Sequence, residues 1–174
     1  MKKILTFVLA IACVLPAFSQ SQYEVISDAQ ENGAKILKGI ITPELIQNEP
    51  AYTWYAENLK NYTPNASAVK ALKSSNADSV ELIVFMGTWC DDSHYIIPKF
   101  FTLLTATGFS KNKVTLIGVD RNKKTISHLA EELNVQSVPT IIAMKNGKEL
   151  GRLVEYGKTG LFDKELGEII APSK

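Results

Sequence analysis

One cysteine stands at the point where an apolar run gives way to polar, helix-forming residues. Cys90 follows the buried-looking stretch 80–86 and the short segment Gly87-Thr88-Trp89. Backbone N–H groups and the positive end of the helix dipole at a helix start favour the thiolate over the thiol. Because the thiolate is the form that attacks disulfides, the position predicts a nucleophilic cysteine. The alternative is a small, buried and inert side chain.

The residue three positions after the cysteine limits what this thiol can do. A two-cysteine redox motif would carry its second thiol there, and this chain carries Ser93. Cys90 can therefore capture a partner sulfur, but it cannot close a disulfide with that position. Two roles for Ser93 remain open, because its hydroxyl can donate a hydrogen bond to the sulfur or simply fill the space of a cysteine.

Three charged or titratable residues share the expected first turn with the thiol. Asp91 and Asp92 complement the helix dipole and oppose a neighbouring thiolate. His94 lies four residues after Cys90 on the same helical face, where its protonated form would favour the thiolate. The alternative is an exposed histidine paired with Asp91 or Asp92. Together these side chains point in different directions, so we expect no metal, and nothing indicates another cofactor.

The first nineteen residues have the pattern of a secretory signal peptide. Lys2 and Lys3 precede an apolar run over 4–15, and small residues follow at 17–19. The run is short for a membrane span, so we expect none after cleavage. The prediction is an extracytoplasmic protein, periplasmic or secreted. The alternative is a lipoprotein anchored through Cys13.

Charge and cysteine content narrow the classes of partner. Residues 20–174 lack Lys2 and Lys3 and so hold 17 basic and 18 acidic side chains, a net charge of −1. This balance gives no electrostatic reason to expect nucleic acid as a partner. Exported proteins usually hold their thiols in disulfides, yet Cys90 alone remains after cleavage, which is a second sign of a reactive thiol.

Beyond residue 78 the hydrophobic pattern alternates between strand and helix. Apolar runs predict buried strands at 80–86 and 114–119, and a pair of later strands at 140–145 and 148–155, joined by the turn pair Asn146-Gly147. Helices are expected over 90–107, with a bend at Pro98, over 122–134, and after Gly160. The order βαβα then ββα predicts an α/β fold with a mixed sheet between two helical layers.

Residues 20–78 are expected to form a helical extension packed on this domain. Helices are predicted over 50–61 and over 65–75, the second capped by Asn65. Their aromatic side chains are expected to cover the sheet, although a peptide-binding surface is the alternative reading. These aromatic residues are Tyr52, Trp54, Tyr55 and Tyr62.

Several of these features together resemble the thioredoxin superfamily. The matching pieces run in order along residues 79–172, so the domain is set at 79–174. They are Trp89-Cys90-Asp91-Asp92-Ser93, Pro98, Ser137-Val138-Pro139-Thr140, the hairpin at Asn146-Gly147, and Gly157. The resemblance implies a three-layer α/β/α fold.

The resemblance also assigns roles to residues of the site and exposes one departure. Pro139 is expected to be the family's cis-proline beside the cysteine, and the Val138 backbone to pair with an extended substrate. Trp89 is expected to shield the sulfur and contact a partner, and the alternative is that it only fills a gap in the surface. The buried carboxylate that thioredoxins carry on the central strand is replaced here by Val84.

The resulting prediction is an exported protein that performs monothiol thiol–disulfide exchange, by reduction or isomerisation. Cys90 would form a mixed disulfide with a protein disulfide, and a second thiol from the partner or from a small molecule would release it. The alternative is a redox-inactive module of the same fold that binds a peptide in a groove next to Trp89, Val138 and Pro139.

Overall fold

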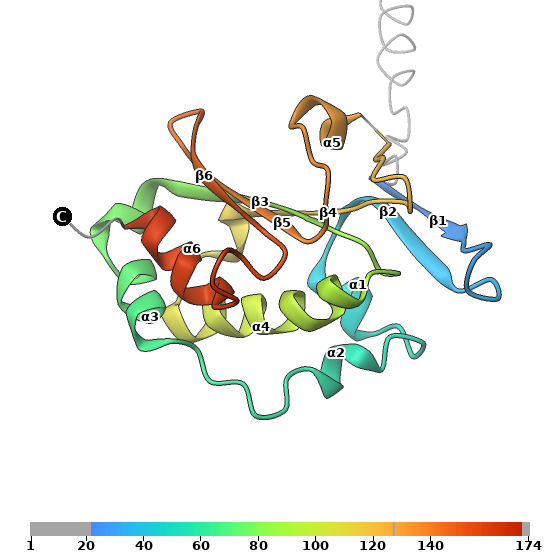
Figure 1. The fold of residues 1–174 in the computed structure, drawn as a ribbon, viewed down its shortest axis with the longest axis horizontal. Coiled ribbons are helices and arrows are strands. Elements are labelled where there is room, and N and C mark those ends of the chain that lie inside the picture. Colours follow the sequence, from blue (N-terminus) through green and yellow to red (C-terminus); the bar gives the residue numbers. More distant parts are fainter. Residues whose placement is uncertain (1–21, 127, 172–174) are drawn as a thin grey trace, which may run out of the picture.

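The computed structural model describes residues 22–126 and 128–171. A sheet in the order β1-β2-β4-β3-β5-β6 runs through the molecule (Figure 1). Only β3 and β4 pair in parallel, so the sheet is mixed as predicted. The strands are β1 (Tyr23–Ser27), β2 (Lys35–Ile41), β3 (Val80–Met86), β4 (Val114–Gly118), β5 (Thr140–Lys145) and β6 (Lys148–Val154).

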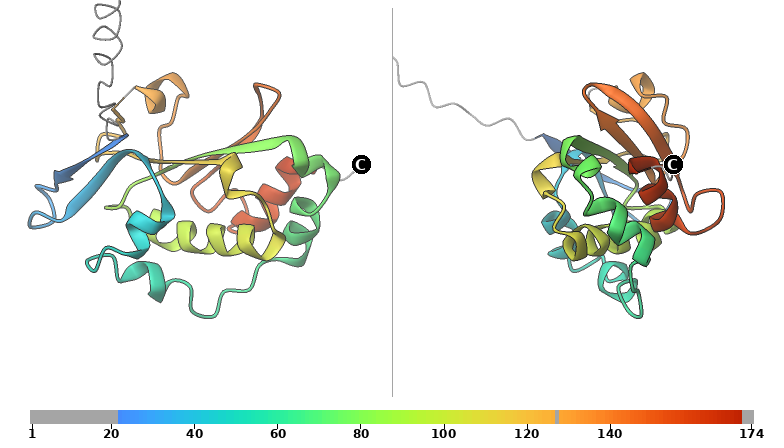
Figure 2. Two further views of the ribbon diagram at one scale, coloured as in Figure 1. Left: turned by 180° about the vertical axis from the view of Figure 1, so that it is seen from behind. Right: turned by 90° about the vertical axis from the view of Figure 1, so that its left-hand side faces the viewer.

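The helices cover the two faces of this sheet unequally. Figures 1 and 2 show α5 alone on one face, and the remaining α-helices on the other. The α-helices are α1 (Pro43–Gln47), α2 (Trp54–Glu57), α3 (Ala66–Leu72), α4 (Asp91–Thr107), α5 (Leu129–Glu132) and α6 (Phe162–Ile170), and the 3₁₀ helices are η1 (Ser75–Ser79) and η2 (Lys111–Lys113). The three-layer α/β/α arrangement is confirmed.

The central strand β3 is buried on both faces toward its carboxyl end. Val84 and Met86 belong to the larger core cluster under α4, whereas Phe85 belongs to the smaller cluster on the α5 face. All three side chains are fully buried. Burying a side chain of this size stabilises the fold by roughly 1.5–3 kcal/mol. The strand end that leads into the cysteine loop is therefore fixed from two sides.

Helix α4 occupies the range that the sequence predicted. Cys90 is its N-cap residue in extended conformation, and Pro98 lies inside it. The helix ends at Gly108, whose φ of 70° is the left-handed geometry that glycine adopts at helix ends. Nine of its residues are buried, and the apolar ones among them, such as Phe100, Leu103 and Leu104, belong to the main core cluster together with side chains of β3 and β5.

The expectation of an all-helical extension is wrong for its first part. Residues 23–41 form the hairpin β1–β2, which joins the sheet by pairing β2 antiparallel with β4. Its turn contains Asn32 and Gly33, both at positive φ. The same Asn-Gly pair, also at positive φ, forms the predicted turn at Asn146-Gly147. The helix expected over 50–61 is observed as the shorter α2, while α3 has the predicted Asn65 cap.

The helix expected over 122–134 is also wrong for most of its length. The Asp120 carboxylate accepts hydrogen bonds from the backbone N–H groups of Asn122 and Lys124, and this local turn competes with a helix start. Only α5 remains helical. Ile126, inside the expected helix, is 47% exposed.

Within residues 22–126 and 128–171, no helix combines the length and apolar character that crossing a membrane requires. The predicted signal peptide and Cys13 lie outside the described residues.

Candidate active site around Cys90

The cysteine sits between the buried end of β3 and the first turn of α4. Its backbone N–H donates to the Gly87 carbonyl at 3.1 Å, and its carbonyl accepts from the His94 N–H at 2.9 Å. The side chain is half-buried and is a free thiol. Cys90 is thus held at the helix start where the sequence placed it, with part of its surface open to solvent.

The loop that begins β5 lies directly against this thiol. The Cys90 Sγ–H donates to the Val138 carbonyl oxygen at 3.1 Å. The Val138–Pro139 peptide bond is cis, the geometry that the family resemblance implies. The sequence-distant residues 90, 138 and 139 therefore meet in one site.

Ser93 is fully buried behind the loop rather than exposed beside the sulfur. Its Oγ accepts a hydrogen bond from the Gly87 N–H at 3.2 Å. Among the residues that the structure describes, no hydrogen bond joins Ser93 to Cys90. Of the two roles left open by the sequence, the observed contacts fit the one in which serine fills the place of a second cysteine.

Trp89 forms one wall of the site. Its indole Nε1 donates to the Val119 carbonyl at 2.9 Å, which fixes the ring plane. A Cβ on Gly87 would lie 2.6 Å from an indole carbon, so a glycine is required where the ring crosses the loop. Two cations face the same ring, Arg121 at 5.2 Å and Lys123 at 5.9 Å from its centroid.

Arg121 is itself held by the N-terminal hairpin. Asp28 is the residue that follows β1. The Arg121 Nε lies 2.9 Å from both carboxylate oxygens of Asp28, and the Arg121 Nη2 lies 2.8 Å from Asp28 Oδ2. Asp28 is only 2% exposed. The hydrogen-bonded Arg121 guanidinium lowers the pKa of the Asp28 carboxyl below its usual value. Sequence reasoning missed this pair, because its members are 93 residues apart.

His94 turns toward the N-terminal segment. Its Nε2 lies 2.7 Å from the Thr88 carbonyl oxygen, which can only accept, so Nε2 carries the hydrogen. The ring stacks on Trp54 at 4.1 Å between centroids. The Asp91 carboxylate lies 3.7 Å from Nδ1. Asp91 lies where it pairs with the ring only when Nδ1 is also protonated, and the ring is covered by Trp54 instead of being exposed.

Comparison with known proteins places this geometry in a family. A thioredoxin family model matches residues 63–165, which is more than half of the chain. The chain belongs to the thioredoxin family. This membership supports thiol–disulfide oxidoreductase chemistry in general.

Individual relatives agree with that assignment. The chain is 33% identical to a thioredoxin of Chlamydia pneumoniae over 102 residues, covering 56% of this chain and 89% of the relative. It is 28% identical over 95 residues to the TPR repeat-containing thioredoxin TDX of Arabidopsis thaliana, of which it spans only 23% while 55% of this chain is covered. The crystal structure of an HIV epitope scaffold is similar in fold alone, with a TM-score of 0.51, 15% identity, and 74% of this chain and 88% of that chain covered.

Asp91 and Asp92 differ in their surroundings within this thioredoxin domain. The Asp91 side chain is fully exposed, whereas Asp92 is half-buried. Asp92 is a charged neighbour of Tyr156, a residue that sequence reasoning did not select. Burial, followed by the neighbouring Asp92 carboxylate, raises the pKa of Tyr156 to about 12, and Tyr95 and Cys90 contribute in the same direction.

The strand position beneath the thioredoxin site carries a valine instead of an acid. Val84, at the position where the family carries a buried carboxylate, is fully buried among apolar side chains. In the described part of the chain, no three His, Cys, Asp or Glu side chains converge as metal ligands.

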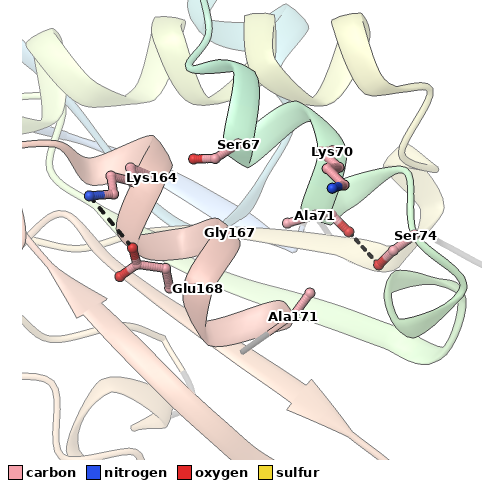
Figure 3. Close-up of a pocket in the computed structure, with 8 residues that line it drawn as sticks. All are labelled: Ser67, Lys70, Ala71, Ser74, Lys164, Gly167, Glu168 and Ala171. Carbon is pink, nitrogen blue, oxygen red and sulfur yellow. Dashed lines mark hydrogen bonds and ion pairs between the residues drawn. The ribbon is translucent and has the colours of Figure 1, made fainter. Parts of the chain in front are cut away.

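A separate groove of about 400 Å³ lies between α3 and α6 of the thioredoxin domain (Figure 3). Figure 1 places it at the end of the molecule away from the β3–α4 junction. Gly167 lets the helices approach closely, since a Cβ there would lie 2.9 Å from the Ala68 Cα. The groove carries a Lys164–Glu168 ion pair at 3.8 Å and no thiol, so it takes no part in the chemistry at Cys90.

Proposed function

We propose that this thioredoxin-family chain performs monothiol thiol–disulfide exchange through Cys90. The observation that carries the proposal is a half-exposed thiol at a helix N-cap, 3.1 Å from the carbonyl that precedes cis-Pro139, with Ser93 in the place of a second thiol. A helix start supports thiolate chemistry, and the missing second thiol requires an external one to finish each cycle.

The exchange takes place in two steps. The Cys90 thiolate attacks one sulfur of a partner disulfide, so that a new S–S bond forms on Cys90 while the partner's other sulfur leaves as a thiolate. A thiolate from the same partner or from a small molecule then attacks the partner sulfur of the mixed disulfide. Cys90 leaves as a thiolate, and the partner has been reduced or its disulfides rearranged, depending on which thiol resolved it.

The surroundings favour a protein as the disulfide partner. The Val138 carbonyl lies 3.1 Å from the Cys90 sulfur, just before β5 and its partner strand β6. An extended peptide can pair with such a backbone through main-chain hydrogen bonds. The proposed site of action is extracytoplasmic, on the strength of the signal-peptide pattern in residues 1–19.

Mixed-disulfide trapping tests the proposal. Wild-type protein and Cys90→Ala are incubated with a peptide carrying one glutathione disulfide, and intact mass is measured before and after addition of a free thiol. We expect an adduct on the wild type that the thiol removes, and none on Cys90→Ala. A wild-type protein that acquires no adduct contradicts monothiol exchange.

A second function, a redox-inactive binding module, is favoured by one specific observation. The Ser93 hydroxyl is occupied by the Gly87 N–H and Val84 supplies no base, so the site has little besides the thiol itself to drive turnover. A partner retained equally well by Cys90→Ser would support this second function.

A further inference from the structure

A short basic loop after β4 lies against the tryptophan that precedes the cysteine. The Val119 carbonyl, at the start of this loop, accepts the Trp89 indole N–H at 2.9 Å. Arg121 and Lys123 of the loop lie 5.2 Å and 5.9 Å from the centroid of the Trp89 ring. Both distances are within the range of about 6 Å in which a cation is attracted to an aromatic ring. The wall of the cysteine site at Trp89 therefore carries two cations.

Hydrogen bonds and an ion pair hold this loop in one shape. The Lys123 N–H donates to the Asp120 carbonyl at 2.9 Å, and the Asp120 N–H donates to the Lys124 carbonyl at 3.1 Å. The Asp120 carboxylate lies 3.2 Å from the Lys38 ammonium, which ties the loop to β2. Lys123 has a φ of 59°, in the left-handed region that lysine seldom adopts. The Lys123 side chain thus leaves a fixed backbone next to Trp89.

The two cations differ in whether a carboxylate already neutralises them. Asp28 lies 2.8 Å and Glu31 lies 3.5 Å from the Arg121 Nη2. In the part of the chain that the structure describes, no carboxylate forms an ion pair with Lys123. Lys123 is half-buried, and a lysine can lay its stem on an apolar surface while its ammonium stays in water. Its charge is therefore available to an anion while the side chain stays at Trp89.

A partner attached to the sulfur comes within reach of this charge. Trp89 links the two points, because it directly precedes Cys90 and its ring faces Lys123. A carboxylate two or three residues from the partner's cysteine lies about 7–10 Å from it along an extended chain. On the helix side of the thiol, Asp91 and Asp92 repel such a carboxylate. An acidic partner is therefore attracted on the Trp89 side only.

We propose that Lys123 determines partner specificity by binding a carboxylate of the disulfide partner, two or three residues from the cysteine that Cys90 attacks. The preferred partner is thus a protein disulfide with an aspartate or glutamate close to it in sequence. The proposal rests on the proposed function for the reaction, whereas the binding of an acidic peptide at Lys123 is independent of it. Lys123 makes and breaks no bond, and it only increases the fraction of partner held at the thiol.

Two peptides of equal length test the proposal. Each has one cysteine, with glutamate two residues away on both sides in the first peptide and glutamine at the same places in the second. Each is used as its symmetric disulfide dimer, so that attack on either sulfur gives the same adduct on Cys90. The rate of adduct formation at low peptide concentration is measured by intact mass for the wild type, Lys123→Gln and Lys124→Gln.

Lys124→Gln is the matched control. It removes the same charge from the same loop, and Lys124 is exposed and is not one of the cations at the Trp89 ring in the described structure. Asp91 and Asp92 remain in all three proteins, so they do not account for a difference between them.

We expect the wild type to react about threefold faster with the glutamate peptide, which is the effect of one exposed ion pair. Lys124→Gln should keep this ratio, and Lys123→Gln should react with both peptides at the same rate. Equal wild-type rates for the two peptides overturn the proposal. An equal loss of preference in Lys124→Gln also overturns it, because net charge would then be responsible.

The two proposals fail in distinguishable ways. If both peptides form the adduct at one rate, the role of Lys123 is wrong and monothiol exchange stands. If neither peptide forms an adduct, exchange is wrong, and the binding of labelled peptides with serine in place of cysteine is measured by fluorescence anisotropy. Tighter binding of the glutamate peptide by the wild type but not by Lys123→Gln then supports the carboxylate site, whereas equal binding of both peptides by the wild type overturns it.

Discussion

At the scale of the residue, the chemistry depends on which polar groups are already engaged. The Ser93 oxygen accepts a hydrogen bond from the backbone of the cysteine loop, and the Trp89 indole N–H donates one to the Val119 carbonyl. Neither side chain can change partners without loosening the loop. The thiol of Cys90 is different, because its acceptor is a single carbonyl on the neighbouring loop and part of its surface is open. Cys90 is therefore open to a partner, whereas Ser93 is fully buried.

Restoring the second thiol should convert the site to dithiol chemistry. In Ser93→Cys the new sulfur stands three residues from Cys90 on the first turn of α4, the spacing of a two-cysteine redox motif. We expect an internal disulfide to form under mild oxidation, measured as the loss of two hydrogens in intact mass and of free-thiol labelling. A variant that keeps both thiols free would show that the buried position of residue 93 cannot reach Cys90.

The matched control is Ser93→Ala, which cannot form a disulfide. It leaves the buried Gly87 N–H without its acceptor, a loss of roughly 1–3 kcal/mol in the free energy of unfolding. Chemical denaturation measures this change. Retention of full stability would mean that water replaces the serine oxygen.

At the scale of the element, the β1–β2 hairpin does more than extend the sheet. Through Asp28 it holds Arg121 over the face of Trp89, and through the carbonyl of Lys35 it accepts hydrogen bonds from Thr88 and Tyr52. The cysteine loop is thus supported by an edge hairpin that lies outside the matched thioredoxin region of 63–165.

The Asp28–Arg121 pair should make this support sensitive to acid. The folded-state pKa of Asp28 lies below its ordinary value of 3.8, so the pair contributes stability above pH 3.8 that is lost as the pH falls through the lower, folded value. Melting temperatures of the wild type and Asp28→Asn, measured from pH 6 downward, should therefore converge below pH 3.8. We also expect altered Trp89 fluorescence in Asp28→Asn at neutral pH, because Arg121 loses its charged anchor. Parallel melting curves at every pH would contradict the role of this carboxylate.

At the scale of the whole molecule, the segment before the matched region is part of the folded unit. Residues 22–62 pair with the β4 edge through β2 and cover His94 with Trp54. Their buried side chains, such as Ile41 and Ile46, belong to the main core cluster. The thioredoxin domain and its extension therefore share one core.

Removing residues 22–62 should consequently destabilise the domain and not merely trim it. The deletion exposes the β4 edge, which is a template for pairing with other chains, and the apolar surface beneath Ile41 and Ile46. We expect aggregation and loss of the cooperative melting transition, measured by light scattering and circular dichroism. A soluble, cooperatively folding fragment of residues 63–174 would show that the extension is dispensable.

Much of this architecture was predictable because short sequence patterns specify it. Continuous apolar runs predicted β3 and β4, the Asn146-Gly147 pair predicted the β5–β6 hairpin, and the polar residues after a buried strand predicted the start of α4 at Cys90. The helix over 122–134 failed because the Asp120 side chain caps a turn there, and the β1–β2 hairpin was missed although Asn32-Gly33 marked its turn.

The sequence by itself determined the kind of chemistry: one thiol at a helix start, a serine where a second thiol would stand, and a proline in the loop expected to face it. These follow from residue type and short spacing, which act over a few bonds. Only the tertiary structure decided which groups surround the sulfur. The Val138 carbonyl at the sulfur and the Asp28-anchored Arg121 over Trp89 come from segments far apart in the chain. Their meeting depends on how the strands order in the sheet, and strand order is set by packing of the whole core rather than by any local pattern.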